Sequence, residues 1–175
     1  FFEERRFGSS GRRIVVEERL EGEEVSLIAL SDGRRLLPLV TSKDYKRIGD
    51  DDQGPNTGGM GAHSPSVVLS EEQAAELHRS LGEATLAGMA AEQRPFSGVL
   101  YVGVMLTDEG PRVLEYNARL GDPEAQAILP RLDDDLLPVL ASGADGRFET
   151  DRLDFSSRAC VCLVLANEGY PGKPI

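Results

Sequence analysis

The sequence contains no tryptophan, only two cysteines and only three lysines among its 175 residues. Cys160 and Cys162 alternate with apolar residues in the strand-like run RACVCLVLA, so their side chains point to the same face. No other cysteine stands near them in the sequence. We therefore expect two buried thiols in preference to a metal-binding pair.

Long apolar runs and positive charge are also scarce. The longest apolar run, at residues 99–106, is far shorter than the ~20 residues that cross a bilayer, and no basic-then-apolar leader opens the sequence. The net charge of -11 argues against duplex nucleic acid, which calls for a basic face. We expect a soluble, cytoplasmic protein with no membrane or nucleic-acid partner. Small phosphorylated molecules are not excluded as ligands by the negative charge.

The few lysines are unevenly placed. Sixteen of the 19 basic residues are arginine, yet Lys43 and Lys46 stand together beside Arg47 in TSKDYKR. A compact ammonium group on a flexible stem can follow phosphate oxygens, which favours a phosphate contact. A solvated charged loop after a strand explains this heptapeptide equally well.

The expected elements follow an α+β order. Ser70 and Gln73 form a capping box that predicts a helix to about residue 92. Asp122 and Pro123 look like the N-cap and the first position of a further helix. A turn at residues 31–33 joins two strands. The expected strands are residues 13–20, 23–30, 35–40, 98–106, 112–120 and 158–166, and a last helix lies within residues 132–143. The chain lacks an initial methionine and stops after a strand-like run, so we expect a piece of a longer protein.

Residues 41–68 form a long segment without helix or strand periodicity, and the glycine-rich stretch GPNTGGMGAHSP lies in it. Loops of such length inside a compact domain are commonly functional or disordered. The aspartates at 50–52 are able to bind a cation, although a solvated turn is the simpler reading. We expect a mobile loop that covers a ligand, with disorder as the alternative.

The run RVLEYNARLGDPE has polar residues at alternate positions. In an extended strand Glu115, Asn117 and Arg119 share one face, and the apolar or small side chains between them share the other. A carboxylate and an amide oxygen two residues apart suit Mg²⁺. A neighbouring guanidinium is able to clamp a carboxylate or phosphoryl group. An ordinary solvent-facing strand is the alternative.

Three segments together resemble one family. Glu17, Leu20 and Glu24 in VVEERLEGEE, the stretch TSKDYKRIGDDDQGPNTGGMGAHSP and the run LEYNARLGDPE occur in the order seen in phosphoribosylamine–glycine ligases, also called glycinamide ribonucleotide synthetases. These are ATP-grasp enzymes of purine synthesis. The first segment by itself would be only an acidic hairpin. The resemblance runs from about residue 13 to residue 132 and resumes near residue 158.

The resemblance implies roles for single residues. The backbone at Glu17, Glu18 and Leu20 would hold adenine, and Glu24 would bond the ribose hydroxyls. Further roles fall on metal ligands (Glu115 and Asn117), on residues where glycine and the phosphoryl group meet (Arg119 and Asp122), and on the substrate side (Lys46, Arg47, Asn56, Thr57, Gly58, Gly59 and Gly61). The glycines would let the backbone approach an anionic substrate and present its amides in a nest.

The resemblance also implies a reaction. ATP with Mg²⁺ or Mn²⁺ would convert glycine to glycyl phosphate, and the amine of 5-phosphoribosylamine would then displace phosphate to give glycinamide ribonucleotide. The sequence departs from the family at Tyr116, Leu120 and His63, where the changes affect packing. Residues 98–106 also lack the acid that many ATP-grasp relatives carry there, so Glu115 would serve both metals or one metal site would be weaker.

The implied architecture is α+β, the carboxy-terminal half of an ATP-grasp domain at residues 1–151 plus the first strand of a small carboxy-terminal domain at residues 152–175. Another ATP-grasp carboxylate–amine ligase is the alternative among enzymes. A nucleotide-binding module without catalysis is a second alternative, and a plain interaction domain that binds no nucleotide is a third.

Overall fold

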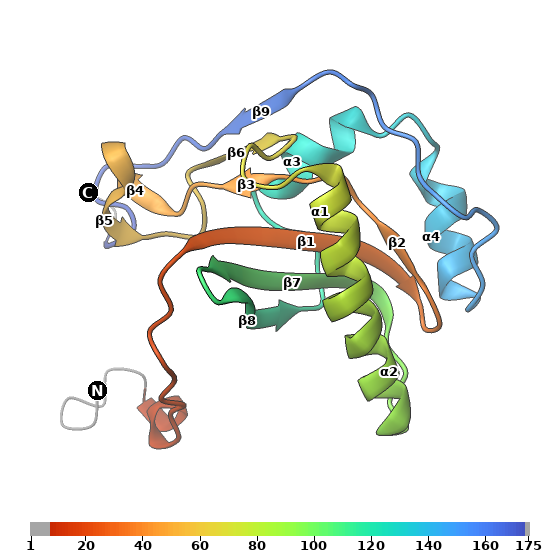
Figure 1. The fold of residues 1–175 in the computed structure, drawn as a ribbon. Coiled ribbons are helices and arrows are strands. Elements are labelled where there is room, and N and C mark those ends of the chain that lie inside the picture. The colour runs from red at the N-terminus through yellow and green to blue at the C-terminus, as the bar shows by residue number, and fades with distance from the viewer. Residues whose placement is uncertain (1–7, 174–175) are drawn as a thin grey trace.

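The structure, a computed structural model, describes residues 8–173. Its centre is a four-stranded antiparallel sheet in the order β2-β1-β7-β8 (Figure 1). The strands are β1 (Glu23–Asp32), β2 (Leu36–Pro38), β7 (Ser97–Thr107) and β8 (Gly110–Asn117). β7 is apolar on both faces and is paired on both edges, as the sequence predicts for a central strand.

A hairpin joins β1 to β2 as predicted, but its turn lies at residues 33–35 instead of 31–33, because β1 continues to Asp32. The Oδ1 atom of Asp32 accepts hydrogen bonds of 2.9 Å from the backbone N–H groups of Arg34 and Arg35. Burial alone would raise the pKa of Asp32, but these bonds and one from the N–H of Phe148 hold it below its usual value. The carboxylate therefore fixes the reversal of the chain.

One face of the sheet is covered by a long helical segment. It consists of α1 (Glu71–Leu77), a π-helical stretch (His78–Glu83) and α2 (Ala84–Ala91), and the predicted capping box of Ser70 and Gln73 is present. The buried side chains of this layer are Val25, Leu27, Leu69, Ala74, Leu77, Leu86, Leu100, Val102 and Val104. The odd-numbered residues of β1 thus face these helices.

The opposite face packs against α3 (Glu124–Ile128) and α4 (Leu136–Ala144). α4 begins with Asp135 as its N-cap, within the stretch where a helix was predicted. The buried side chains of this second layer include Ile28, Leu30, Leu37, Leu39, Tyr101, Ile128, Val139 and Phe148. On this face β1 is polar at Glu24 and Ser26 and apolar at Ile28 and Leu30.

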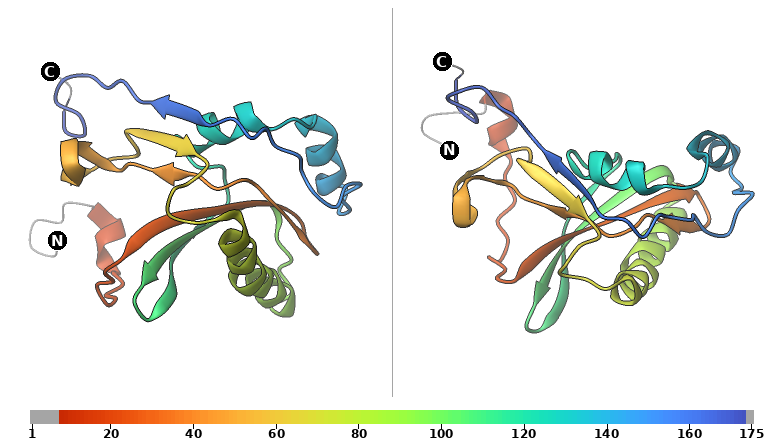
Figure 2. Two further views of the ribbon diagram at one scale, coloured as in Figure 1. Left: turned by 45° about the horizontal axis from the view of Figure 1, so that its top comes forward. Right: turned by 90° about the horizontal axis from the view of Figure 1, so that it is seen from above.

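The segment at residues 41–68 is more regular than expected. It contains β3 (Lys43–Asp44), β4 (Arg47–Gly49), β5 (Gln53–Asn56) and β6 (Gly61–Ser64). β6 pairs with β3 on one edge and with β9 (Cys160–Leu163) on the other, and β4 pairs with β5. In Figures 1 and 2 these strands lie together beyond β1. Strands of two to four residues are too short to show periodicity, which is why the sequence did not reveal them.

Three local predictions are wrong. Residues 13–20 follow a short 3-10 helix (Gly8–Arg12) and form no strand, and Val15 and Val16 are 79% and 85% exposed because no strand within residues 8–173 pairs with them. α3 begins at Glu124, with Pro123 as its N-cap. Asp122 accepts a bond of 2.7 Å from Gln126 Nε2 instead of capping the helix.

The third wrong prediction concerns the cysteines. Cys160 and Cys162 are free thiols, as expected, but both are half-exposed because β9 is an edge strand of its sheet. Across residues 8–173 the structure has no helix with the length and apolar character needed to span a membrane.

Candidate active site

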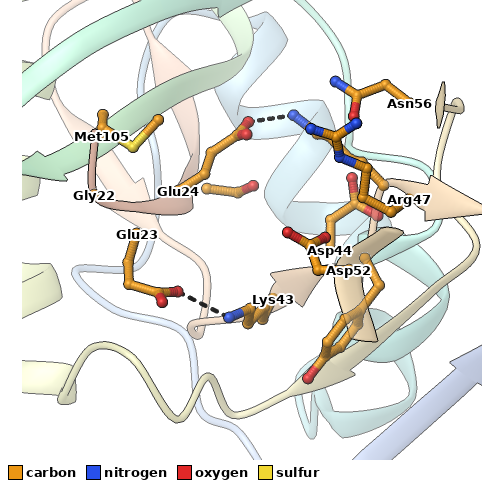
Figure 3. A pocket seen from close by; sticks show the side chains of 12 residues that line it. Gly22, Glu23, Glu24, Lys43, Asp44, Arg47, Asp52, Asn56 and Met105 are labelled. Carbon is orange, nitrogen blue, oxygen red and sulfur yellow. Dashed lines mark hydrogen bonds and ion pairs between the residues drawn. The ribbon is translucent and has the colours of Figure 1, made fainter. Parts of the chain in front are cut away.

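A pocket of about 430 Å³ opens where the start of β1 faces the segment from β3 to β5. Figure 3 shows Glu23 and Glu24 on one wall and Lys43, Asp44 and Arg47 on the other. Of the residues predicted for the site, the pocket brings together Glu24, Lys46, Arg47 and Asn56. Glu24 precedes the other three residues by 22 to 32 positions in the chain.

Gly22 sets the start of the first wall. Its φ is +155°, and a Cβ atom on it would overlap the carbonyl oxygen of Leu106 on β7. Only glycine allows β1 to begin this close to β7. The two glutamates that follow are thereby placed at the mouth of the pocket.

Two ion pairs cross the pocket, as Figure 3 shows. Lys43 Nζ lies 3.0 Å from Glu23 Oε2, and Lys46 donates to Glu24 Oε1. Burial alone would lower the pKa of Lys46, but the hydrogen bond and charge of Glu24 and the charges of Asp44 and Glu115 raise it above its usual value. Lys46 is therefore a fixed cation among three carboxylates.

The surroundings of Asp44 disfavour the charged form of its carboxyl group. Its Oδ1 atom is buried and has no hydrogen-bond partner within the described part of the chain. Burial and the charges of Glu124 and Glu24 raise the pKa of Asp44 to about 7, although Lys46 opposes them. A group poised in this way in a pocket is typical of functional sites.

Glu124 forms a buried polar cluster beside Asp44. Only 2% of Glu124 is exposed, and its Oε1 atom accepts bonds of 3.0 Å from Ser26 Oγ and 3.1 Å from the Tyr101 hydroxyl. Burial and the charge of Glu124 raise the pKa of Tyr101 well above its usual value, so this hydroxyl stays a donor. The first turn of α3 is thus tied to β1 and β7.

The amides of the glycine stretch are already engaged. The N–H and Oγ1 of Thr57 donate to the Lys46 carbonyl at 2.7 and 2.8 Å, and Gly59 N–H donates to Thr57 Oγ1 at 3.0 Å. Met60 N–H donates to the Tyr45 carbonyl at 2.7 Å. The open nest of amides that the resemblance implied is therefore not the arrangement of this loop, and its amides instead fix it to the segment that carries Lys46.

Gly59 joins this loop to the LGDPE run. Its φ is +124°, and a Cβ atom there would overlap Pro123 Cδ and would lie 3.0 Å from the Asp122 carbonyl oxygen. Two motifs that are more than 60 residues apart in the sequence are consequently in backbone contact. The glycine is required for close packing, independently of any ligand.

Glu115 and Asn117 lie on the same sheet as Glu24 and Ser26. Glu115 pairs with Gly103, which in turn pairs with Ser26. Asn117 Nδ2 donates to Glu115 Oε1 at 3.0 Å, which leaves the amide oxygen and the second carboxylate oxygen available. Two hard oxygen donors fit a Mg²⁺ ion that takes its remaining ligands from phosphate and water. Residues 8–173 contain no group of three acidic, histidine or cysteine side chains that would hold a metal without such help.

The other predicted residues lie outside the pocket. Arg119 is exposed and donates to the Leu120 carbonyl at 2.9 Å, and Asp122 is exposed beside α3. The residues predicted to hold adenine lie in the extended stretch before β1: Glu17 and Glu18 are exposed and Leu20 is half-exposed. Asp50–Asp52 form an exposed 3-10 turn, as a solvated turn would, and of the three only Asp52 lines the pocket.

Sequence reasoning missed Asp44, Ser26, Tyr101 and Glu124. Asp44 was considered only as part of the charged heptapeptide TSKDYKR. The available signal was the spacing between Asp44 and Lys46, which puts both side chains on one side of an extended segment. The burial of Glu124 depends on contacts with β1 and β7 and has no local signal.

The fold and the site define a class. The sheet, which carries Glu115 and Asn117 on its edge strand β8, is that of an ATP-grasp domain. One solved structure of this fold is the biotin carboxylase domain of 2-oxoglutarate carboxylase from Hydrogenobacter thermophilus, determined with MgADP, ADP and bicarbonate. It has a TM-score of 0.55 and 16% identity, and the match covers 83% of this chain and 30% of that one.

Closer matches identify the family. Residues 1–125 match the family described as the ATP-grasp (A) domain of phosphoribosylglycinamide synthetase, and the chain belongs to this family. The phosphoribosylamine–glycine ligase of Brucella melitensis is 46% identical over 95% of this chain and 39% of its own length. The crystal structure of the Thermotoga maritima phosphoribosylamine–glycine ligase has a TM-score of 0.82 and 36% identity over 91% of this chain and 40% of that one. The chain therefore spans about two fifths of the length of the relatives it matches.

Proposed function

We propose that this chain supplies the carboxy-terminal part of the active site of a phosphoribosylamine–glycine ligase, an ATP-dependent carbon–nitrogen ligase of de novo purine biosynthesis. The observation that carries the proposal is the position of Lys46. Its ammonium group, bonded to Glu24 and close enough to Asp44 and Glu115 to have its pKa raised by them, connects three separate motifs of the family on one face of the sheet. The cytoplasm is the compartment that this biosynthetic role implies.

The substrates would be ATP, glycine and 5-phosphoribosylamine. The glycine carboxylate attacks the γ-phosphoryl group of ATP and forms glycyl phosphate with release of ADP. The amine of phosphoribosylamine then attacks the acyl carbon, loses a proton and expels phosphate to give glycinamide ribonucleotide. Such a reaction asks the protein chiefly to position its substrates and to neutralise charge.

The nucleotide would lie along the start of β1. The backbone at Glu17, Glu18 and Leu20 would hold adenine, and Glu24, which lines the pocket, would bond the ribose hydroxyls. Lys46 holds the Glu24 carboxylate in a fixed direction, because the two side chains are bonded to each other. Lys46 and Arg47, which line the pocket, would contact phosphate or substrate.

Glu115 and Asn117 would hold the metal ion, Mg²⁺ or Mn²⁺. The ion would supply positive charge to the phosphate oxygens of ATP. Glu115 is already balanced by Lys46, and Asn117 orients it through the bond to its Oε1 atom. Because β7 places Gly103 opposite Glu115 and has no acid at that position, Glu115 would carry the metal site without a second carboxylate from β7.

Glycine and the phosphoryl group would meet at Arg119 and Asp122. Arg119 is exposed and has only a carbonyl as its partner, so its guanidinium is able to turn to an anion. The phosphoribosylamine would approach over the glycine loop from Asn56 to Gly61, which packs on the Asp122–Pro123 backbone through Gly59. We also propose a domain boundary near residue 151, with the ATP-grasp part before it.

Two other functions are weighed against this one. Another ATP-grasp carboxylate–amine ligase would share Glu115 and Asn117 but would use a different acid or amine. A nucleotide-binding module without catalysis would need Glu24 but not Arg119 or Asp122. The presence of all of them, with the glycine loop in contact with Asp122, favours the ligase that uses glycine.

The test is formation of ADP by the full-length gene product that contains this chain. We expect ADP release that requires both glycine and phosphoribosylamine generated in the assay, and none when alanine replaces glycine. The variant Arg119→Met should lower turnover at least tenfold, whereas Arg94→Met, on an exposed residue outside the pocket, should not. ADP release that depends on another acid would support the second ligase, and nucleotide binding without any release would support the module.

A further inference from the structure

The glycine loop is held from two sides. Three of its amides, those of Thr57, Gly59 and Met60, are bonded within the segment that carries Tyr45 and Lys46. The amide of Gly58 is the exception, because it donates to the hydroxyl oxygen of Tyr170 at 3.2 Å. This bond joins residues that are 112 positions apart in the chain.

The segment that carries Tyr170 is itself attached to the loop. β9 pairs with β6 in a register that sets Leu163 opposite Gly61, and the next residue, Val164, donates its N–H to the Met60 carbonyl at 3.0 Å. The chain then turns at residues 167–172, where Tyr170 N–H donates to the Asn167 carbonyl at 3.2 Å. The turn brings the phenol ring back over the tip of the glycine loop.

Gly58 is the place where the loop needs an external contact. It is exposed, and glycine has more backbone freedom to lose than any other residue. Without the Tyr170 hydroxyl its amide would have no partner within the described part of the chain. The hydroxyl accepts from Gly58 and has no acceptor for its own hydrogen among residues 8–173.

We propose that Tyr170 is a positioning residue for the ligase site. It fixes Gly58, and thereby the wall of the glycine loop that faces phosphoribosylamine, from a segment beyond the proposed domain boundary. This inference rests on the proposed function. It makes residues 160–170 a part of the substrate side of the site, whereas the nucleotide side at Glu24 and Glu115 is formed without them.

The test uses the full-length protein with Tyr170→Phe, which keeps the ring and removes only the hydroxyl. The matched control is Tyr116→Phe, because the Tyr116 hydroxyl also accepts one bond, of 3.2 Å from Thr85 Oγ1, but lies against α2. Amide hydrogen exchange is followed in the peptide that contains Gly58. We expect exchange there to become about three- to tenfold faster in the Tyr170 variant and to stay unchanged in the control.

Steady-state kinetics give the second readout. A loop that is loose before binding weakens binding of the ground state and the transition state alike, so the KM for phosphoribosylamine should rise about three- to tenfold with kcat unchanged. The KM for ATP should not change. Unchanged exchange at Gly58, or faster exchange with an unchanged KM for phosphoribosylamine, would overturn the proposal. Because the exchange measurement needs no turnover, failure of the Tyr170 contact is distinguishable from failure of the ligase assignment.

Discussion

The buried Oδ1 atom of Asp44 lies against Gly59, only 2.9 Å from the position that a Cβ atom would take there. The Asp44 carboxyl group therefore keeps its position only while residue 59 has no side chain. Asp44 belongs to the strand next to Lys46, and Gly59 belongs to the loop that touches Pro123. The contact sets the distance between the nucleotide side and the substrate side of the proposed site.

Gly59→Ala should separate loop packing from nucleotide binding. The methyl group meets Pro123, Asp44 and Asp122 at a positive φ, so we expect a loss of about 2 kcal/mol in the free energy of unfolding. Turnover should fall at least tenfold while the Kd for Mg·ADP changes less than twofold. Gly88→Ala is the control, since nothing lies within 4 Å of its added Cβ and alanine favours the helix. Equal effects of the two substitutions would contradict this role of Gly59.

Asp44→Asn should stabilise the protein at high pH. The pKa of Asp44 in the fold is about 7, above the 3.8 of an unperturbed Asp, so its contribution to stability is present below pH 4 and is lost as the pH rises to 7. Asparagine resembles the protonated acid and cannot ionise. We expect the variant to be about 2 kcal/mol more stable than wild type at pH 8, after discounting for partial exposure, and equal at pH 4.

Urea unfolding at the two pH values measures this difference. Asp51→Asn is the matched control, because Asp51 is exposed in the same segment. We expect it to change stability by less than about 0.5 kcal/mol at either pH. If Asp44→Asn were the less stable protein at pH 8, Asp44 would not be a strained carboxyl group.

His78 gives the opposite dependence on pH. Burial in the π-helical stretch lowers its pKa from 6.5 to about 4, so the unfolded chain binds a proton that the folded chain rejects. Its contribution to stability is present above pH 6.5 and is lost as the pH falls to 4. We expect the stability difference between wild type and His78→Gln to shrink by about 3 kcal/mol between pH 7 and pH 4.

Much of the main sheet could be predicted because its signals are local. The capping box at Ser70 is a hydrogen-bond pattern of four residues, and the apolar run that forms β7 is complete in itself. Residues 13–20 have equally good strand composition but form no strand, because strand pairing depends on a partner and not on propensity. Short strands such as β3 and β5 were not predicted because two to four residues show no periodicity.

Some residues of the candidate site could be proposed from the sequence, but their contacts could not. The types and spacing of Glu115 and Asn117 indicate oxygen ligands, and Lys46 was singled out by the rarity of lysine. The pairing of Lys46 with Glu24 and the contact of Gly59 with Pro123 join residues more than 20 positions apart. Such contacts follow from the arrangement of strands and leave no trace in the local sequence.

The central claim is that Glu115 and Asn117 hold the metal of a bound nucleotide, and calorimetric titration of Mg·ADP into the full-length protein tests it most directly. The titration is repeated with EDTA and with the double variant Glu115→Gln, Asn117→Ala. The account predicts binding that is lost with EDTA and weakened at least tenfold in the folded double variant. Equal, metal-independent binding by the wild type and the double variant would contradict it.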